Sequence, residues 1–253
     1  MNILIGQKLE DISIEAARLF MSLSRRYIRS SGRFVTALSG GRTPERLYEI
    51  LASDYYQKGI AWSKVHIFWV DERFVASDHP DSNFRLVQET LLQSITLPQH
   101  NIHPIRTQGA TASVSAKKYE ADVKDFFKIT KKDVFPRFDL IILGIGEDGH
   151  TASLFPGSKK LGDREHLAVA VQNRKTQHPR ITLTLPVLNS ARHILFLVSG
   201  KSKAPVIKKV IIQRDGTIPA SLVNPYDGKC HYFFDQDAGS CLLKTGVKKH
   251  ATR

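Results

Sequence analysis

The chain of 253 residues is long enough to bury one large hydrophobic core, and its 42% hydrophobic and 24% charged residues are typical of a globular protein. This composition excludes a disordered chain, a coiled coil and a collagen-like repeat. The 37 Lys and Arg residues outnumber the 24 Asp and Glu residues and leave a net charge of +13, which raises the question of an anionic partner.

The predicted elements of the first half alternate between strands and helices. A short apolar segment over Asn2–Ile5 precedes a predicted helix with Asp11 as its N-cap, because apolar residues then recur at helical spacing. Thr43 and Pro44 predict the start of a second helix, with Thr43 as N-cap and Pro44 at the first helical position. The other predicted elements are strands over Arg33–Leu38 and Val65–Val70, helices over Asn83–Leu92 and Ala112–Phe127, and an irregular segment with a short strand at most over Pro98–Ile105.

The second half continues the same alternation. It predicts strands over Phe138–Leu143, Leu167–Val171, Ile181–Leu185 and His193–Val198, then helices over Lys201–Ile212 and Asp235–Leu243. Apolar runs such as VHIFWV, FDLIIL and ILFLV, separated by helices, are typical of a parallel sheet covered on both faces. No linker-like segment interrupts the chain. We therefore expect one α/β domain over residues 1–253, an open, mostly parallel twisted sheet with helices on both faces.

The cysteines and the apolar segments indicate the cellular compartment of the protein. Cys230 and Cys241 form no CxxC pair and cannot make a disulfide framework, the N-terminus does not resemble a signal peptide, and the longest apolar run has only strand length. We expect a cytoplasmic protein without a membrane partner. Basic residues gather loosely at Arg25–Arg33, Lys201–Lys209 and Lys244–Arg253 without the interleaved aromatic residues of a base-stacking groove. The alternatives are a solvated basic surface and steering of a doubly charged phosphate substrate, and the two are compatible.

Ligands of open α/β sheets bind beyond the carboxyl ends of the strands. The first segment at such an end is SGGRTP, in which Gly40 and Gly41 let backbone N–H groups approach an anion at a helix N-terminus. The hydroxyl groups of Ser39 and Thr43 are available to the same anion. The Gly-Lys-Ser/Thr of a nucleotide-binding P-loop is absent, so the alternatives are a small anion site or a plain tight turn.

Three charged residues, Asp71, Glu72 and Arg73, follow the strand that ends at Val70. Arg73 offers a planar fork suited to a phosphate or a developing oxyanion, and Asp71 is suited to orienting a hydroxyl or a catalytic group. A solvated loop with a local Arg–carboxylate pair is the simpler interpretation of this tripeptide alone.

The segment GIGEDGHTASLFP places His150 in a glycine-rich loop after the strand ending at Leu143. It contains GxGxxG, but Pro156 interrupts the long helix that a dinucleotide site requires. Histidine is suited to proton transfer near neutral pH, and one of the flanking carboxylates, Glu147 or Asp148, can fix its tautomer. Ser153 lies outside a GxSxG motif, and no Cys/His cluster or HExxH motif predicts a metal site.

Basic side chains at two further strand ends, Arg180 on one side and Lys201 or Lys203 on the other, are suited to neutralising a phosphate dianion. Together with the histidine and the glycine turn, they indicate proton-transfer chemistry on a small phosphorylated molecule. The residues leave the particular reaction open.

The segments ALSGGRTP, WVDERFV, LGIGEDGHTASLFPG, RITLTLPVLNSARHILFLVSGKSK and IPASLV, in this order, resemble the 6-phosphogluconolactonases of the glucosamine-6-phosphate isomerase superfamily. The match runs from about Ser39 to Val223. The isomerase/deaminase branch is similar at SGG and DGH, but the TASLFP continuation favours the lactonases.

The resemblance implies hydrolysis of 6-phospho-D-glucono-1,5-lactone without a cofactor, by an open α/β enzyme that is a monomer or weak homo-oligomer. It implies that His150 is the general base, that Asp148 or Asp71 holds its ring or a sugar hydroxyl, and that Arg73 serves the oxyanion or the phosphate. The implied 6-phosphate ligands are Ser39, Gly40, Gly41, Thr43, Arg180 and Lys203, with Lys201 as an alternative to Lys203. The rival interpretations are a sugar-phosphate isomerase or deaminase, a non-catalytic effector-binding module and a nucleic-acid binder.

Overall fold

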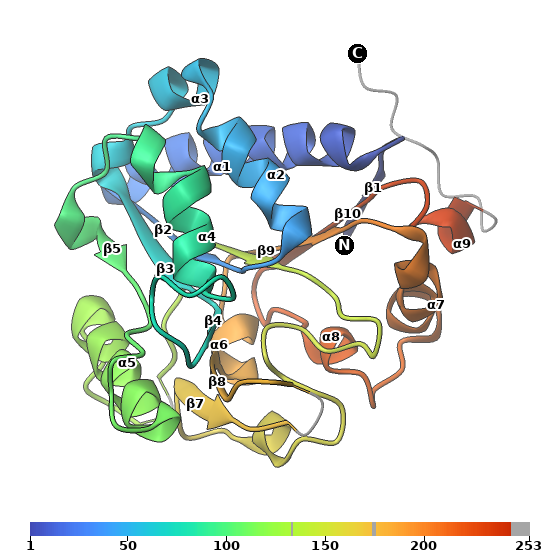
Figure 1. Cartoon of the computed structure of the whole chain (residues 1–253). Coiled ribbons are helices and arrows are strands. Elements are labelled where there is room, and N and C mark those ends of the chain that lie inside the picture. Colours follow the sequence, from blue (N-terminus) through green and yellow to red (C-terminus); the bar gives the residue numbers. More distant parts are fainter. Residues whose placement is uncertain (133, 174–175, 244–253) are drawn as a thin grey trace.

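Seven parallel strands form the main sheet of the computed structural model, which describes residues 1–132, 134–173 and 176–243. Helices cover both faces of this sheet (Figure 1). The predicted open, mostly parallel α/β fold is therefore confirmed, whereas a single domain over residues 1–253 stays a prediction. The spatial order of the strands is β1 (Asn2–Ile5), β10 (Lys229–Phe234), β9 (His193–Val198), β6 (Leu140–Leu143), β2 (Phe34–Leu38), β3 (Val65–Trp69) and β5 (Ile102–His103).

The apolar runs of the sequence become the buried centre of this sheet. All residues of β2, β6 and β9 are buried, because each strand has helices or loops on both sides. Helix α1 (Leu9–Ser31) places one apolar stripe on the sheet, and its Phe20 meets Phe34 edge to face with ring centroids 5.2 Å apart. Burying one such aromatic side chain stabilises the fold by roughly 1.5–3 kcal/mol.

A second, smaller sheet is antiparallel and consists of β4 (Asp71–Arg73), β8 (Arg180–Leu183) and β7 (Ala168–Val171). The sequence predicts the last two as strands, but it does not predict that they form a separate antiparallel sheet. It does not predict β4 at all, because a charged tripeptide has no strand pattern of its own. Pairing with β8, in which Arg73 lies opposite Arg180, makes this segment a strand.

Two predicted helix starts are wrong by a few residues. Helix α1 begins at Leu9, and the Asp11 carboxylate accepts the backbone N–H groups of Gln7 and Lys8 from within its first turn. Helix α2 (Arg42–Leu51) has Gly41 as its N-cap, at φ 109°, which glycine adopts without strain. Thr43 is therefore inside the first turn and does not cap the helix.

The remaining elements follow the prediction in part. Helix α5 (Ala112–Phe127) has the predicted bounds, and α4 (Asn83–Thr90) ends two residues early. The predicted helix from Lys201 consists of a 3-10 turn, α7 (Ala204–Ile207) and a π-helical segment over Lys208–Gln213. Strand β10 and the short helices α3 (Asp54–Gly59), α6 (Leu185–Asn189) and α8 (Pro219–Leu222) are not predicted, and only α9 (Ser240–Leu243) forms in the last predicted helix. The basic cluster Lys244–Arg253 lies outside the described residues.

No helix among the described residues is both long enough and apolar enough to cross a membrane. Both cysteines are free thiols and are partly buried.

Candidate active site

An open cleft of about 480 Å³ lies beyond the carboxyl ends of β2, β6 and β9 and beside the small antiparallel sheet. Residues from segments far apart in the sequence meet there. The sequence-predicted site residues that line it are Ser39, Gly40, Gly41, Thr43, Asp71, Arg73, His150, Arg180 and Lys203. Asp148 lies behind His150, and Lys201 is not part of the lining.

The turn between β2 and α2 forms one wall of the cleft. The first N–H groups of a helix have no partner within the helix, so the start of α2 at Arg42 and Thr43 presents donors and a partial positive charge to the cleft. A Cβ on Gly40 would lie 1.7 Å from Asn83 Oδ1, which is why only glycine fits there. The Ser39 hydroxyl donates to the carbonyl of Ile142 at 2.7 Å, so its proton is directed into β6 rather than toward a ligand.

Asp71 is buried at the floor of the cleft and is held by residues that the sequence analysis missed. Its Oδ2 accepts the Ser153 hydroxyl at 2.6 Å, and its carbonyl accepts the Asn83 side-chain amide at 2.8 Å. Asn83 is itself buried at the start of α4. Asp71 is thus a fixed acceptor beneath the cleft. No short-range signal in the sequence links these three positions.

Glu72 points away from the cleft and braces the start of α4. Its carboxylate accepts the backbone N–H groups of Arg73, Asn83 and Phe84 at 2.7–2.8 Å and the Ser82 hydroxyl at 3.2 Å. Burial raises the pKa of Glu72 to about 7, and these backbone hydrogen bonds limit the rise. The structure therefore corrects the interpretation of Asp71-Glu72-Arg73 as a solvated loop, because two of the three residues are buried.

Arg73 and Arg180 face one another across β4 and β8 and both line the cleft. Within the described residues, the Nε atoms of both guanidinium groups are buried and have no hydrogen-bond partner. Burial lowers the pKa of Arg180, the Asp71 carboxylate opposes this change, and the charge of Arg73 adds to it. Two adjacent like charges with free donors are suited to an anion.

His150 lies in the loop after β6, with its ring at the cleft. Its Nδ1 is 2.6 Å from Asp148 Oδ1, and the same oxygen accepts the His150 backbone N–H at 3.1 Å. Burial favours the neutral acid of Asp148, but the hydrogen bonds and charge of His150 outweigh burial and lower its pKa. A carboxylate only accepts, so Nδ1 carries the proton of the neutral ring and Nε2 carries the lone pair.

Two neighbours fix the orientation of the imidazole. The Phe155 ring packs against it with centroids 4.8 Å apart, and the Arg180 guanidinium lies over the same phenyl ring at 5.9 Å. A Cβ on Gly146 would lie 2.1 Å from His150 Nδ1, so glycine is needed for the ring to approach the backbone. Phe155 therefore joins the predicted base to the predicted phosphate ligand, a link that the sequence analysis did not find.

The loop after β9 also lines the cleft. Lys203 ends the 3-10 turn over Lys201–Lys203 and lines the cleft, whereas Lys201 does not. The Asp235 carboxylate accepts the Gly200 backbone N–H at 3.0 Å and fixes the start of this turn. The structure thus places Lys203, rather than Lys201, at the cleft.

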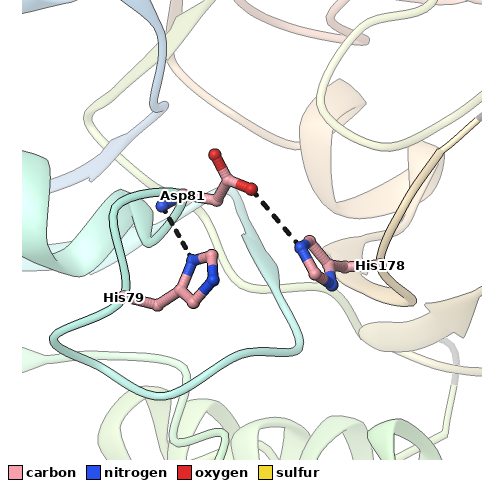
Figure 2. A group of neighbouring side chains, drawn as sticks. All are labelled: His79, Asp81 and His178. Carbon is pink, nitrogen blue, oxygen red and sulfur yellow. Dashed lines mark hydrogen bonds and ion pairs between the residues drawn. The ribbon is translucent and has the colours of Figure 1, made fainter.

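One group of side chains among the described residues lies close enough to share a metal ion. It consists of His79, Asp81 and His178 (Figure 2). None of the three lines the cleft. Any metal site there is separate from the imidazole of His150.

The fold and cleft define an α/β enzyme that is suited to proton transfer on a small anionic substrate. A family model described as glucosamine-6-phosphate isomerases/6-phosphogluconolactonase matches residues 7–232. The chain belongs to this family.

Named relatives fall on the lactonase side of the family. The chain is 42% identical to a 6-phosphogluconolactonase of Synechocystis sp. over 219 residues, which cover 85% of this chain and 87% of the relative. The crystal structure of 6-phosphogluconolactonase from Thermotoga maritima matches with a TM-score of 0.79 and 28% identity over 92% of this chain and 99% of that one. A monomeric glucosamine-6-phosphate deaminase, at 23% identity and a TM-score of 0.77 over 95% of this chain and 99% of that one, shares the fold.

Proposed function

We propose that this protein hydrolyses 6-phospho-D-glucono-1,5-lactone to 6-phosphogluconate. The names of its relatives support this reaction. The observation that carries the proposal is the hydrogen bond from His150 Nδ1 to the Asp148 carboxylate, at the edge of a cleft lined with cationic groups.

His150 acts as the general base in this proposal. Its Nε2 takes a proton from water while the water oxygen adds to the lactone carbonyl carbon, which becomes a tetrahedral alkoxide. The carbonyl then reforms, the bond to the ring oxygen breaks, and the imidazolium returns its proton to that oxygen. Asp148 keeps Nδ1 protonated and stabilises the imidazolium, while Phe155 prevents the ring from turning away.

The 6-phosphate binds the cationic groups around the cleft. The backbone N–H groups at the start of α2 and the ammonium group of Lys203 are suited to a dianion, as is the guanidinium group of Arg180. We assign Arg73 to the phosphate as well, because it lies beside Arg180 in the antiparallel register. Binding energy from the phosphate then holds the lactone carbonyl near His150.

A coupled assay tests the reaction. Lactone is generated from glucose 6-phosphate by its dehydrogenase, and formation of 6-phosphogluconate is followed against the spontaneous opening of the lactone. We expect the protein to accelerate this step well above the background. Release of ammonia from glucosamine 6-phosphate, without lactone turnover, would instead support the isomerase/deaminase interpretation.

The setting of the enzyme is part of the same proposal. We infer a cytoplasmic enzyme that is a monomer or weak homo-oligomer and has neither a nucleic-acid nor a membrane partner. Gel filtration with light scattering tests the oligomeric state. Steeply salt-dependent binding to duplex or single-stranded nucleic acid would contradict the expectation that the enzyme has no nucleic-acid partner.

A further inference from the structure

Two loops outside the cleft bring nitrogen and oxygen ligands together. His79 and Asp81 lie in the loop between β4 and α4, and His178 lies just before β8 (Figure 2). One ligand atom from each of the three side chains lies within 4.8 Å of the other two. The two loops are joined at the same place by the Phe74 backbone N–H, which donates to the Pro179 carbonyl at 2.8 Å.

The contacts within this group leave one buried atom unsatisfied. His178 Nε2 lies 3.3 Å from Asp81 Oδ2, yet it is buried and makes no hydrogen bond to any described residue, because the approach is poorly aligned. Buried polar atoms normally have a partner. A nitrogen and a carboxylate oxygen that face each other without a hydrogen bond are arranged as ligands of a shared cation.

We propose that His79, Asp81 and His178 bind a divalent transition-metal ion of the Zn²⁺ type, with water completing the coordination. Two imidazoles and one carboxylate favour zinc-like ions over Mg²⁺ and Ca²⁺, which prefer all-oxygen sites. His79 Nδ1 accepts the Asp81 backbone N–H at 3.0 Å. This hydrogen bond holds the His79 ring beside Asp81.

The proposed ion connects the two loops next to Arg73 and Arg180, which line the cleft. The Arg73 guanidinium donates to the Asp81 carbonyl, and His178 is two residues from Arg180. A metal held by both loops therefore fixes the segments that carry the two arginines without entering the cleft. This site does not depend on the lactonase reaction.

Titration of the full chain, without a histidine tag, with Zn²⁺ or Co²⁺ in excess Mg²⁺ tests the site. We expect one equivalent to bind, Co²⁺ to give a visible ligand-field spectrum, and Zn²⁺ to raise the unfolding temperature. His178→Ala should weaken binding by at least about 100-fold, since even loss of an outer partner of a metal ligand costs about 10–100-fold.

The matched control is His166→Ala, because His166 Nδ1 also contacts a carboxylate, that of Asp163 at 3.1 Å, but belongs to no three-ligand group within the described residues. This variant should bind as the wild type does. Asp81→Asn keeps the backbone contacts of Asp81 and should also weaken metal binding. It tests the site independently if His178→Ala does not fold. Absence of a bound equivalent, or equal loss in His178→Ala and His166→Ala, would overturn the proposal.

Discussion

The two sheets make different contributions to the same cleft. The seven-stranded parallel sheet ends in backbone turns and loops, and from these come the start of α2, the His150 loop and the Lys203 turn. The three-stranded antiparallel sheet contributes side chains from within its strands, Asp71, Arg73 and Arg180.

This difference bears on how each residue is held for its role. A loop at a strand end can approach substrate closely and hold a histidine at an exposed angle, whereas a strand within a sheet holds charged side chains at a fixed spacing. We therefore expect substitution of His150, in a loop at the end of the large sheet, to lower turnover. Substitution of a cationic phosphate ligand, whether Arg180 in the small sheet or Lys203 at the end of the large one, should weaken substrate binding. The predictions below test that division.

The largest effect is expected from His150→Asn. It removes the base but keeps a polar side chain at the end of the large sheet, so kcat should fall about 10²–10⁴-fold with KM nearly unchanged. Steady-state kinetics in the coupled assay measure both constants. His166→Asn, which removes a histidine from an exposed His–Asp pair elsewhere, is the control and should keep full activity. A wild-type rate from His150→Asn would contradict the assigned mechanism.

Loss of a phosphate ligand should have a smaller effect, mainly on binding. Arg180→Ala or Lys203→Ala removes one charge-assisted hydrogen bond, so KM should rise about tenfold to hundredfold. Lys201→Ala is the matched control, because Lys201 lies in the same 3-10 turn but not in the cleft lining. A KM increase for Lys201→Ala equal to that for Lys203→Ala would show that the wrong lysine is assigned. A fall in kcat alone for Arg180→Ala would contradict the assignment of Arg180 to phosphate binding.

The smallest effect is expected on stability, at the brace behind the small sheet. Glu72→Gln replaces a carboxylate oxygen by an amide nitrogen that cannot accept, which leaves a buried N–H without a partner and costs about 1–3 kcal/mol of unfolding free energy. Urea unfolding measures it. Glu89→Gln, at an exposed ion pair of α4, should change stability by less than about 0.5 kcal/mol.

The same variant carries a pH signature. The pKa of Glu72 is raised to about 7 from an ordinary value of 4.5. Between pH 4.5 and 7, Glu72 is therefore protonated to a greater extent in the folded protein than in the unfolded chain. Its contribution to stability is therefore complete below about pH 4.5 and is lost as the pH rises to about 7. The stability difference between wild type and Glu72→Gln should narrow over this range. A constant difference would show that Glu72 is ionised throughout.

The sequence predicts the parallel sheet well because buried parallel strands are continuous apolar runs, as in β6 and β9. It misses β10, whose Lys229, Cys230 and His231 interrupt the apolar pattern, and β4, which is a strand only through its pairing with β8. In both cases tertiary contacts override the local signal.

The site follows the same rule. His150 and the glycine turn are found because their motifs are local, and the strand-end rule places them in one cleft. Ser153, Asn83 and Phe155 are missed, because their contacts join residues that are distant in the sequence. The sequence also does not predict the direction of the Ser39 hydroxyl, because its acceptor is a carbonyl of β6.

The paired guanidinium groups of Arg73 and Arg180 have a consequence for the protein without substrate. Burial and the charge of Arg73 both disfavour the charged form of Arg180, and a bound dianion offsets this cost, so inorganic phosphate should protect the fold against heat more than chloride of equal ionic strength does. The product carries a new carboxylate in addition to its phosphate. We therefore expect the product to dissociate slowly from these cationic groups and to inhibit the enzyme.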